Sequence, residues 1–256
     1  MDSRKSLSIE KFLSGYNSCT VAFSGGVDSA LLVYLCSEHI GGRVVAVTVK
    51  APWVPEHDLR DADEFCAEYN IEHRVVSFGI NDIKGFKENP ADRCYICKKA
   101  LFKEIRRVSE DAGAEAVFEG SNTDDLSDYR PGKKALKELG AVSPFVEAGL
   151  SKQDIRELSA DLGLDTYNKP SSACIASRVP YGDVLTVEKL ERVQKAETAL
   201  HNMGFTVLRV RDHRGCARVE LGPAEIDKGW EQRLGIREAL MACGFTQVSI
   251  DTRGYV

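Results

Sequence analysis

Short apolar runs alternate with longer amphipathic stretches through the first two thirds of the chain. Such runs, rich in β-branched residues, predict strands, and apolar positions three and four residues apart predict helices. The predicted strands cover residues 19–23, 44–49, 72–79 and 115–121, and the predicted helices cover 29–40, 56–71, 94–113 and 150–164. This order predicts an α/β fold with a doubly wound parallel sheet, because parallel strands need helical crossovers. Ligands of such sheets bind at the carboxyl ends of the strands.

The pattern changes near residue 170. A loop rich in Pro, Ser and Gly (165–183) precedes a helix, two strands, a helix and a last strand, at 186–204, 205–213, 216–222, 231–244 and 245–251. This run predicts a small α+β domain. We therefore expect a nucleotide-binding domain at 1–170. We expect residues 171–256 to form a linker loop and a second domain for substrate binding or oligomerisation.

Composition and charge limit the expected partners and the expected location of the protein. The formal net charge of −5 disfavours nucleic acid as the main partner, since polyanion grooves usually carry a basic excess. No apolar run approaches the ~20 residues of a membrane span, and the first residues lack the apolar core of a signal peptide. We expect a cytoplasmic protein. Its eight cysteines are then more readily explained as buried, metal-binding or catalytic than as disulfides.

The loop after the first predicted strand has the layout of a phosphate-binding loop but no lysine. Its residues are Ser24, Gly25, Gly26, Val27, Asp28 and Ser29. The glycines allow close backbone approach, and the following helix offers N–H donors to an anion. Asp28 is compatible with a phosphate only if it binds Mg²⁺ or caps the helix. The alternative is a tight strand-to-helix turn with a capping side chain.

Three cysteines stand in polar surroundings. Cys94 and Cys97 form a C-x-x-C motif at a predicted helix start, where the helix and Lys98 would favour thiolate, and Cys174 lies in the polar loop. A four-cysteine zinc site would need a second C-x-x-C. Three thiolates would leave one iron of a cubane cluster without a protein ligand. The alternative is a pair of half-buried cysteines.

Several charged and polar residues are further candidates for binding substrate or Mg²⁺. Leu208 and Val210 are expected to face the core, and the intervening Arg209, Arg211 and His213 would then face outward. Arginine forks suit phosphate and carboxylate groups; a solvated sheet face is the alternative. Lys98, Ser177 and Arg178, which lie near the three cysteines in the sequence, are further candidates for binding substrate. Asp124 or Asp125 could bind Mg²⁺ or cap a helix.

The loop at residues 24–29 resembles the PP-loop of ATP pyrophosphatases, whose adenine nucleotide alpha hydrolase-like domain adenylates a substrate and releases pyrophosphate. The motifs "DRCYICKKALF", "EGSNTDDLSDYRPG", "KPSSACIASRVPYG", "LRVRDH" and "GFTQVSIDTRGY" follow in the order of the LarE family. The resemblance covers essentially the whole chain.

The resemblance implies a sulfur transferase using ATP and Mg²⁺. Its substrate would be pyridinium-3,5-biscarboxylic acid mononucleotide, whose carboxylates become thiocarboxylates on the way to the nickel-pincer nucleotide of lactate racemase. Cys94, Cys97 and Cys174 match members that hold a 4Fe–4S cluster with a transferable sulfide. In the sacrificial alternative, Cys174 alone gives up its sulfur. The implied partners are a sulfur donor system, a nickel insertion protein downstream and further copies of the chain.

Three rival functions remain open. A tRNA thiolation enzyme is expected to show a larger basic surface than a net charge of −5 suggests. An amide-forming ligase such as NAD synthetase would not need the three cysteines. A nucleotide-binding regulatory module would not need Asp28 and Ser29.

Overall fold

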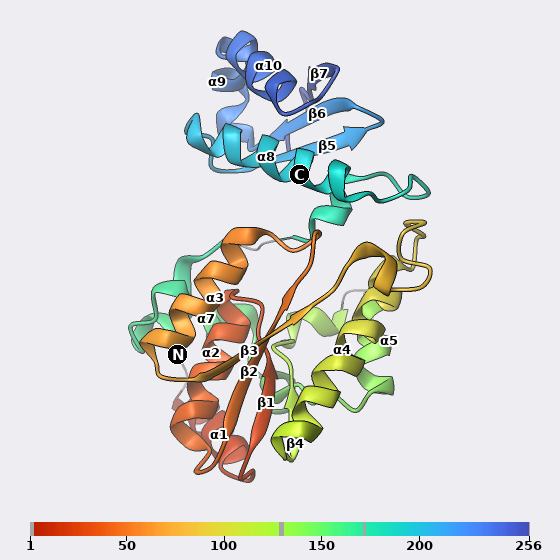
Figure 1. Ribbon diagram of the computed structural model, residues 1–256. Helices are drawn as coiled ribbons and strands as arrows, with labels where there is room; N and C mark the ends of the chain where they lie inside the picture. The colour runs from red at the N-terminus through yellow and green to blue at the C-terminus, as the bar shows by residue number, and fades with distance from the viewer. Residues whose placement is uncertain (1–2, 128–130, 171–172, 256) are drawn as a thin grey trace. The chain divides into compact units, whose positions relative to one another are not determined.

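The computed structural model describes residues 3–127, 131–170 and 173–255. The chain forms two compact units (Figure 1). The first consists of Met1–Gly79 and Asp92–Ser172, and the second of Ile80–Ala91 and Ala173–Val256. Separate roles for domains 1–170 and 171–256 stay a prediction.

The first unit is built on a parallel sheet. Its strands are β1 (Cys19–Ala22), β2 (Val44–Lys50), β3 (Glu72–Ser77) and β4 (Ala116–Phe118). They lie in the order β3-β2-β1-β4, and every neighbouring pair is parallel. The predicted doubly wound α/β fold is confirmed.

Helices cover both faces of this sheet (Figure 1). They are α1 (Ser3–Leu13), α2 (Val27–His39), α3 (Glu56–Glu68), α4 (Arg93–Ala112), α5 (Pro131–Glu138), α6 (Pro144–Glu147) and α7 (Lys152–Asp161), with 3₁₀ turns η2 (Asp124–Ser127) and η3 (Asp165–Asn168). The sequence patterns predicted α2, α3, α4 and α7 but not α1, α5 or α6.

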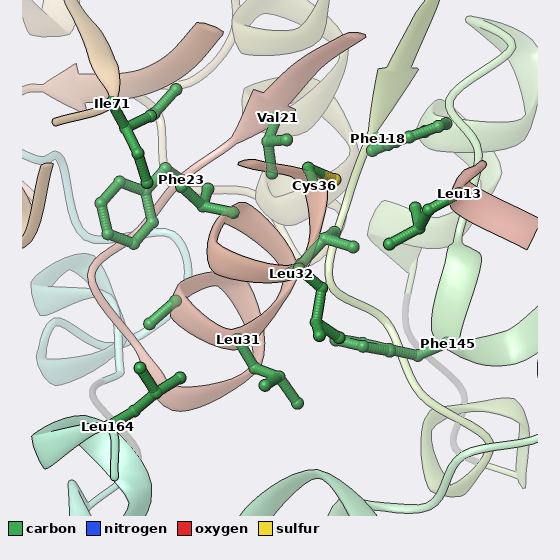
Figure 2. Packing of buried hydrophobic residues seen from close by; sticks show 14 of the residues in the cluster. Leu13, Val21, Phe23, Leu31, Leu32, Cys36, Ile71, Phe118, Phe145 and Leu164 are labelled. Atoms are coloured by element: carbon green, nitrogen blue, oxygen red, sulfur yellow. The ribbon is translucent and has the colours of Figure 1, made fainter. Parts of the chain in front are cut away.

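Strand alternation divides the core of the first unit between the two faces of the sheet. On β2, Val45 and Val47 pack with residues of α4 and α5, whereas Ala46 joins the cluster formed with α1, α2 and α3. Successive side chains of a strand point to opposite faces, so a buried strand is apolar throughout. Figure 2 shows the larger cluster, in which Leu31 and Leu32 of α2 lie among side chains from the surrounding elements.

The strand order places a topological switch point between β1 and β4. The chain runs outward from β1 through β2 to β3, and then returns to add β4 on the other side of β1. Ligands of open α/β sheets bind beside such a point, at the carboxyl ends of the strands. The loops after β1 and β4 are therefore the expected walls of a site.

The second unit carries a three-stranded sheet of order β5-β6-β7. Strands β5 (Leu208–His213) and β6 (Cys216–Leu221) are antiparallel, and β7 (Gln247–Ile250) runs parallel to β6. The helices are α8 (Val187–Asn202), α9 (Ile226–Glu231) and α10 (Arg233–Ala242), with turns η1 (Ile80–Asp82), η4 (Ile175–Arg178) and η5 (Pro223–Glu225). The predicted α+β character is confirmed. The single helix predicted at 231–244 is wrong at its start, because the chain turns at Gln232 between α9 and α10.

An early segment of the chain, Ile80–Ala91, belongs to this second unit. The buried Asn89 donates from Nδ2 to the carbonyls of Val179 and Pro180, at 3.2 and 2.7 Å. The carbonyl of Asn89 accepts from Gly182 at 2.9 Å. The segment is thus bonded into the unit through both its backbone and a buried amide.

The start of α7 makes the first unit sensitive to acid. Asp154 completes a capping box with Ser151 and accepts from Lys5 Nζ at 2.6 Å. Burial alone would raise the pKa of Asp154, but the bonds from Lys5 and Ser151 outweigh it and hold the pKa at about 2. A depressed folded-state pKa stabilises the fold above the unfolded-state value, and this stabilisation is lost as the pH falls from about 4 to about 2.

We expect Asp154→Asn to lower the free energy of unfolding by about 1 kcal/mol at pH 7, since the cap and the ion pair are weakened. The difference from wild type should shrink as the pH falls to 3. Urea unfolding at pH 7, 5 and 3 measures both effects. A difference that stays constant over this range would contradict the role of the ionised carboxylate.

Candidate functional site

The loop between β1 and α2 is held by its two serines. Ser29 Oγ donates to the Gly26 carbonyl at 3.1 Å and accepts from the Ser24 backbone N–H at 3.2 Å. The hydroxyls of Ser24 and Ser29 are 3.0 Å apart. These bonds fix the turn that leads into α2, whose first N–H groups and partial positive charge suit an anion.

Two glycines allow other elements to lie against this loop. A Cβ on Gly25, whose φ is +72°, would lie 2.7 Å from the Asp58 carbonyl oxygen of α3. A Cβ on Gly120, which follows β4, would lie 3.2 Å from the Ser29 nitrogen. The loops after β1 and β4 therefore meet at the switch point, as the fold predicted.

Asp28 is held by partners from distant parts of the chain. Its Oδ2 pairs with Lys152 Nζ at the start of α7, and its Oδ1 accepts from Asn122 Nδ2 at 3.4 Å. The side chains of Asp28 and Lys152 are 27% and 28% exposed, so both remain accessible to a ligand. The loop lacks a lysine of its own, but the fold supplies one.

The acidic pair after β4 lies in the same network. Asp125 Oδ2 accepts from the Asn122 backbone N–H at 3.1 Å, and Asp124 Oδ2 accepts from the Lys152 N–H at 2.9 Å. Asp124 thus caps the start of α7, which was the alternative to metal binding. Within the described ranges, no group of three or more His, Cys, Asp or Glu side chains is arranged to hold a metal ion. Mg²⁺ binding by Asp28 and Asp125 stays a prediction.

The cysteines separate into buried and accessible thiols. Cys19, Cys36 and Cys66 lie in the apolar core of the first unit. Burial raises the pKa of Cys66 to about 12 and raises that of Cys36 well above its ordinary value, so neither is a nucleophile near neutral pH. Cys94 and Cys174 are exposed.

The C-x-x-C motif occupies the first turns of α4 in the first unit. Cys94 and the partly exposed Cys97 are three residues apart in this helix and therefore share a face. Lys98 packs its aliphatic chain against α5, because a Cβ on Gly132 would lie 2.6 Å from Lys98 Cδ. Cys174 lies in the second unit and immediately precedes η4, at its N-cap position.

The arginines of β5 alternate with buried apolar residues along the strand, as the sequence predicted. Leu208 and Val210 are buried, and Arg209 and Arg211 are partly exposed. Both guanidinium groups already have partners within the second unit. Arg211 Nε donates to Glu220 at 2.7 Å, and Arg209 lies over the Tyr255 ring at 4.4 Å. An anion at these residues would have to share them with Glu220 and Tyr255.

Arg178 is buried, and its environment differs from that expected of an open anion site. It forms a two-bond ion pair with Glu197 of α8, at 2.8 and 3.1 Å. Its Nη1 donates to the Ala173 carbonyl and to Ser177 Oγ, at 3.2 and 2.9 Å. Arg178 and Ser177 therefore brace the turn that carries Cys174, and a direct contact with substrate stays a prediction.

Sequence reasoning missed two lysines beside the PP-loop. Lys152 pairs with Asp28, and Lys169 Nζ lies 2.9 Å from the Gly25 carbonyl. Their partners are 124 and 144 residues away in the chain. No local pattern marks such pairs. The predicted helix at 150–164 located α7 but not the position that the Lys152 side chain would reach.

Comparison with known proteins shows which family has this sequence. The family model described as NAD synthase matches residues 5–104, which include the PP-loop. The chain is 36% identical to an uncharacterised protein of Synechocystis sp., over 96% of this chain and 93% of that protein. It is 34% identical to the pyridinium-3,5-bisthiocarboxylic acid mononucleotide synthase of Lactiplantibacillus plantarum, over 92% and 86% of the two chains. The chain belongs to the LarE family.

As a LarE family member, the protein is an ATP-using enzyme with the PP-loop fold and a sulfur transferase. The similarity extends more weakly to other PP-loop enzymes. A tRNA-specific 2-thiouridylase of Azorhizobium caulinodans is 28% identical, over 79% of this chain and 61% of that enzyme. None of the described helices of this LarE family member is long and apolar enough to cross a membrane.

Proposed function

We propose that the protein converts a carboxylate of pyridinium-3,5-biscarboxylic acid mononucleotide into a thiocarboxylate for nickel-pincer nucleotide biosynthesis. The observation that carries this proposal is the 34% identity, over nearly the whole chain, to an enzyme named for the corresponding bisthiocarboxylic acid mononucleotide. The PP-loop geometry and the exposed cysteines supply chemistry that agrees with it.

The first step is adenylation. A substrate carboxylate oxygen attacks the α-phosphorus of ATP, forms an acyl adenylate and releases pyrophosphate. The turn fixed by Ser24 and Ser29 presents backbone N–H groups to the leaving pyrophosphate. The Lys152 ammonium, next to Asp28, adds positive charge at this loop. With Mg²⁺ bound, Asp28 would become a ligand and Lys152 would be free to face phosphate oxygens.

The second step is attack of sulfur on the acyl adenylate, which forms the C–S bond and expels AMP. The donor set consists of Cys94 and Cys97 on one helix face and Cys174 at the start of η4. Cysteine thiolates are the usual ligands of a 4Fe–4S cluster, and these three would be its ligands under this proposal. When bound, such a cluster supplies a sulfide from its open iron. Cys94, Cys97 and Cys174 would hold the cluster.

The sacrificial alternative differs in its sulfur source. There the Sγ of Cys174 attacks the adenylate, and loss of the Cα proton then breaks the Cβ–S bond and leaves dehydroalanine. A cytoplasmic location, a homo-oligomeric state, a sulfur donor system and a downstream nickel insertion protein are further predictions of the same proposal.

The test is an anaerobic purification followed by assays of iron, acid-labile sulfide and thiocarboxylate formed from ATP and the mononucleotide. A cluster predicts about four irons per chain. Cys94→Ala should lose both the iron and the repeated turnover. Cys243→Ser, at a partly buried thiol at the end of α10, is the control and should retain both.

The outcomes separate the alternatives. Thiocarboxylate formed once per chain without iron, with dehydroalanine at Cys174, would replace the cluster by the sacrificial mechanism. Absence of thiocarboxylate in protein that releases pyrophosphate would overturn the proposed substrate. Thiolation of tRNA by such protein would favour the 2-thiouridylase alternative.

A further inference from the structure

The Lys169 side chain contacts the PP-loop on the side that faces α3. It follows η3 in the chain, and its Nζ lies 2.9 Å from the Gly25 carbonyl oxygen. The same ammonium lies 2.7 Å from Asp61 Oδ2 and 3.1 Å from Asp58 Oδ1, both on α3. The Lys169 side chain is only 16% exposed. One enclosed cation therefore joins the backbone of the loop to two carboxylates.

The charges at this position matter for an anionic ligand. Asp58 is buried, and its Oδ1 accepts no hydrogen bond from the described residues, so the nearby ammonium stabilises it by charge alone. Without Lys169, among the described residues, Asp58 would keep only the exposed His57 ring at 3.5 Å, and Asp61 only the exposed Arg60 at 3.9 Å. These more distant groups would balance the two carboxylates less well beside a loop that must attract phosphate.

The geometry of the peptide bond links Lys169 to the ligand side of the loop. In a planar trans peptide, the carbonyl and the following N–H point in opposite directions. When Lys169 holds the Gly25 carbonyl toward α3, the Gly26 N–H must point away from α3. Gly25 has a φ of +72°, which its lack of a side chain makes accessible. A glycine peptide turns over easily, so its orientation needs an external contact.

We propose that Lys169 is a positioning residue for the PP-loop. It holds the Gly25 carbonyl away from the phosphates, keeps the Gly26 N–H available to pyrophosphate, and cancels charge on Asp58 and Asp61. This inference rests on the ATP use of the proposed function but not on the sulfur source or the substrate.

The test compares ligands that reach the loop with one that does not. Isothermal titration of the full chain measures the affinities for inorganic pyrophosphate, ATP and adenosine. Lys169→Met, which keeps the chain length but removes the ammonium, should weaken pyrophosphate and ATP at least about tenfold, the effect of losing about 1.4 kcal/mol. Adenosine affinity should be unchanged. Lys169→Arg, which keeps a positive charge, should bind pyrophosphate and ATP nearly as well as wild type. Lys103→Met, at an exposed lysine of α4, is the control and should leave all three affinities unchanged.

A double variant separates position from charge. Lys169→Met with Asp61→Asn removes one positive and one negative charge, but leaves the Gly25 carbonyl without its donor. We expect pyrophosphate binding to remain weak. Full recovery would show that only net charge matters and would overturn the positioning role.

Two further outcomes would also overturn it: unchanged pyrophosphate affinity in Lys169→Met, or an equal loss of adenosine affinity together with a lower unfolding midpoint. Wild-type protein that binds neither ATP nor pyrophosphate would instead refute the proposed function, and this inference with it.

Discussion

Gly25→Ala is expected to reduce ATP-dependent pyrophosphate release at least about 100-fold, which corresponds to about 2.7 kcal/mol. Gly25 has a φ of +72°, a conformation that costs an alanine roughly 1–2 kcal/mol. The added Cβ would also lie 2.7 Å from the Asp58 carbonyl oxygen. That oxygen belongs to the backbone of α3 and cannot rotate away, so the loop itself must move out of its anion-binding shape.

A matched substitution isolates this cause. Gly41, just after α2, has no atom within 4 Å of an added Cβ. Gly41→Ala should therefore keep wild-type kinetics. A pyrophosphate assay at several ATP concentrations should show Gly25→Ala impaired even when ATP is abundant. Activity of Gly25→Ala close to that of Gly41→Ala would show that the loop does not bind phosphate in this conformation.

Arg178→Met is expected to lower the free energy of unfolding of the second unit by about 3–5 kcal/mol and to abolish sulfur transfer. The Arg178 and Glu197 side chains are 7% and 13% exposed. Removing the guanidinium leaves the Glu197 carboxylate enclosed and unbalanced, although the Val210 N–H still donates to it. The Ala173 carbonyl and Ser177 Oγ also lose their donor, so the turn that begins at Cys174 loses its brace.

Urea unfolding and hydrogen exchange of η4 measure the two consequences separately. In the double variant Arg178→Met with Glu197→Met, the enclosed charge is absent, so much of the stability should return. Thiocarboxylate formation should not return, because the turn is still unbraced. Arg214→Met is the control: this arginine is 84% exposed, and its pair with Asp183 should contribute about 1 kcal/mol or less. Wild-type stability of Arg178→Met would contradict the account.

The central strands of the first unit, β1 and β2, were predictable because most of their residues are buried. Buried parallel strands read as apolar runs, and β2 is apolar from Val44 to Val47. The short α1 was missed although Ile9 and Leu13 are fully buried. Its remaining positions are mostly polar, so the stretch resembles a surface segment until the core that receives it is known.

The site was only partly predictable, for a different physical reason. Backbone requirements such as a glycine at φ +72° mark the sequence locally, and they identified the PP-loop. The partners of a side chain leave no such local mark in the sequence. The alternation of Arg209 and Arg211 was correct, yet the bond from Arg211 to Glu220 depends on the register of β5 against β6. Lys152 and Lys169 reach the loop only once the whole first unit has folded.

The place of Ile80–Ala91 in the second unit has a consequence for the order of events during synthesis. This segment leaves the ribosome well before its hydrogen-bonding partners around Val179 and Gly182 exist. Ile83 and Phe86 are buried in the finished protein, within a unit whose other residues, Ala173–Val256, have not yet been synthesised. Chains generally fold as domains emerge. The first unit can therefore fold before residues 80–91 find their partners. In stalled chains that end near residue 170, this segment should be accessible to chaperones or proteases.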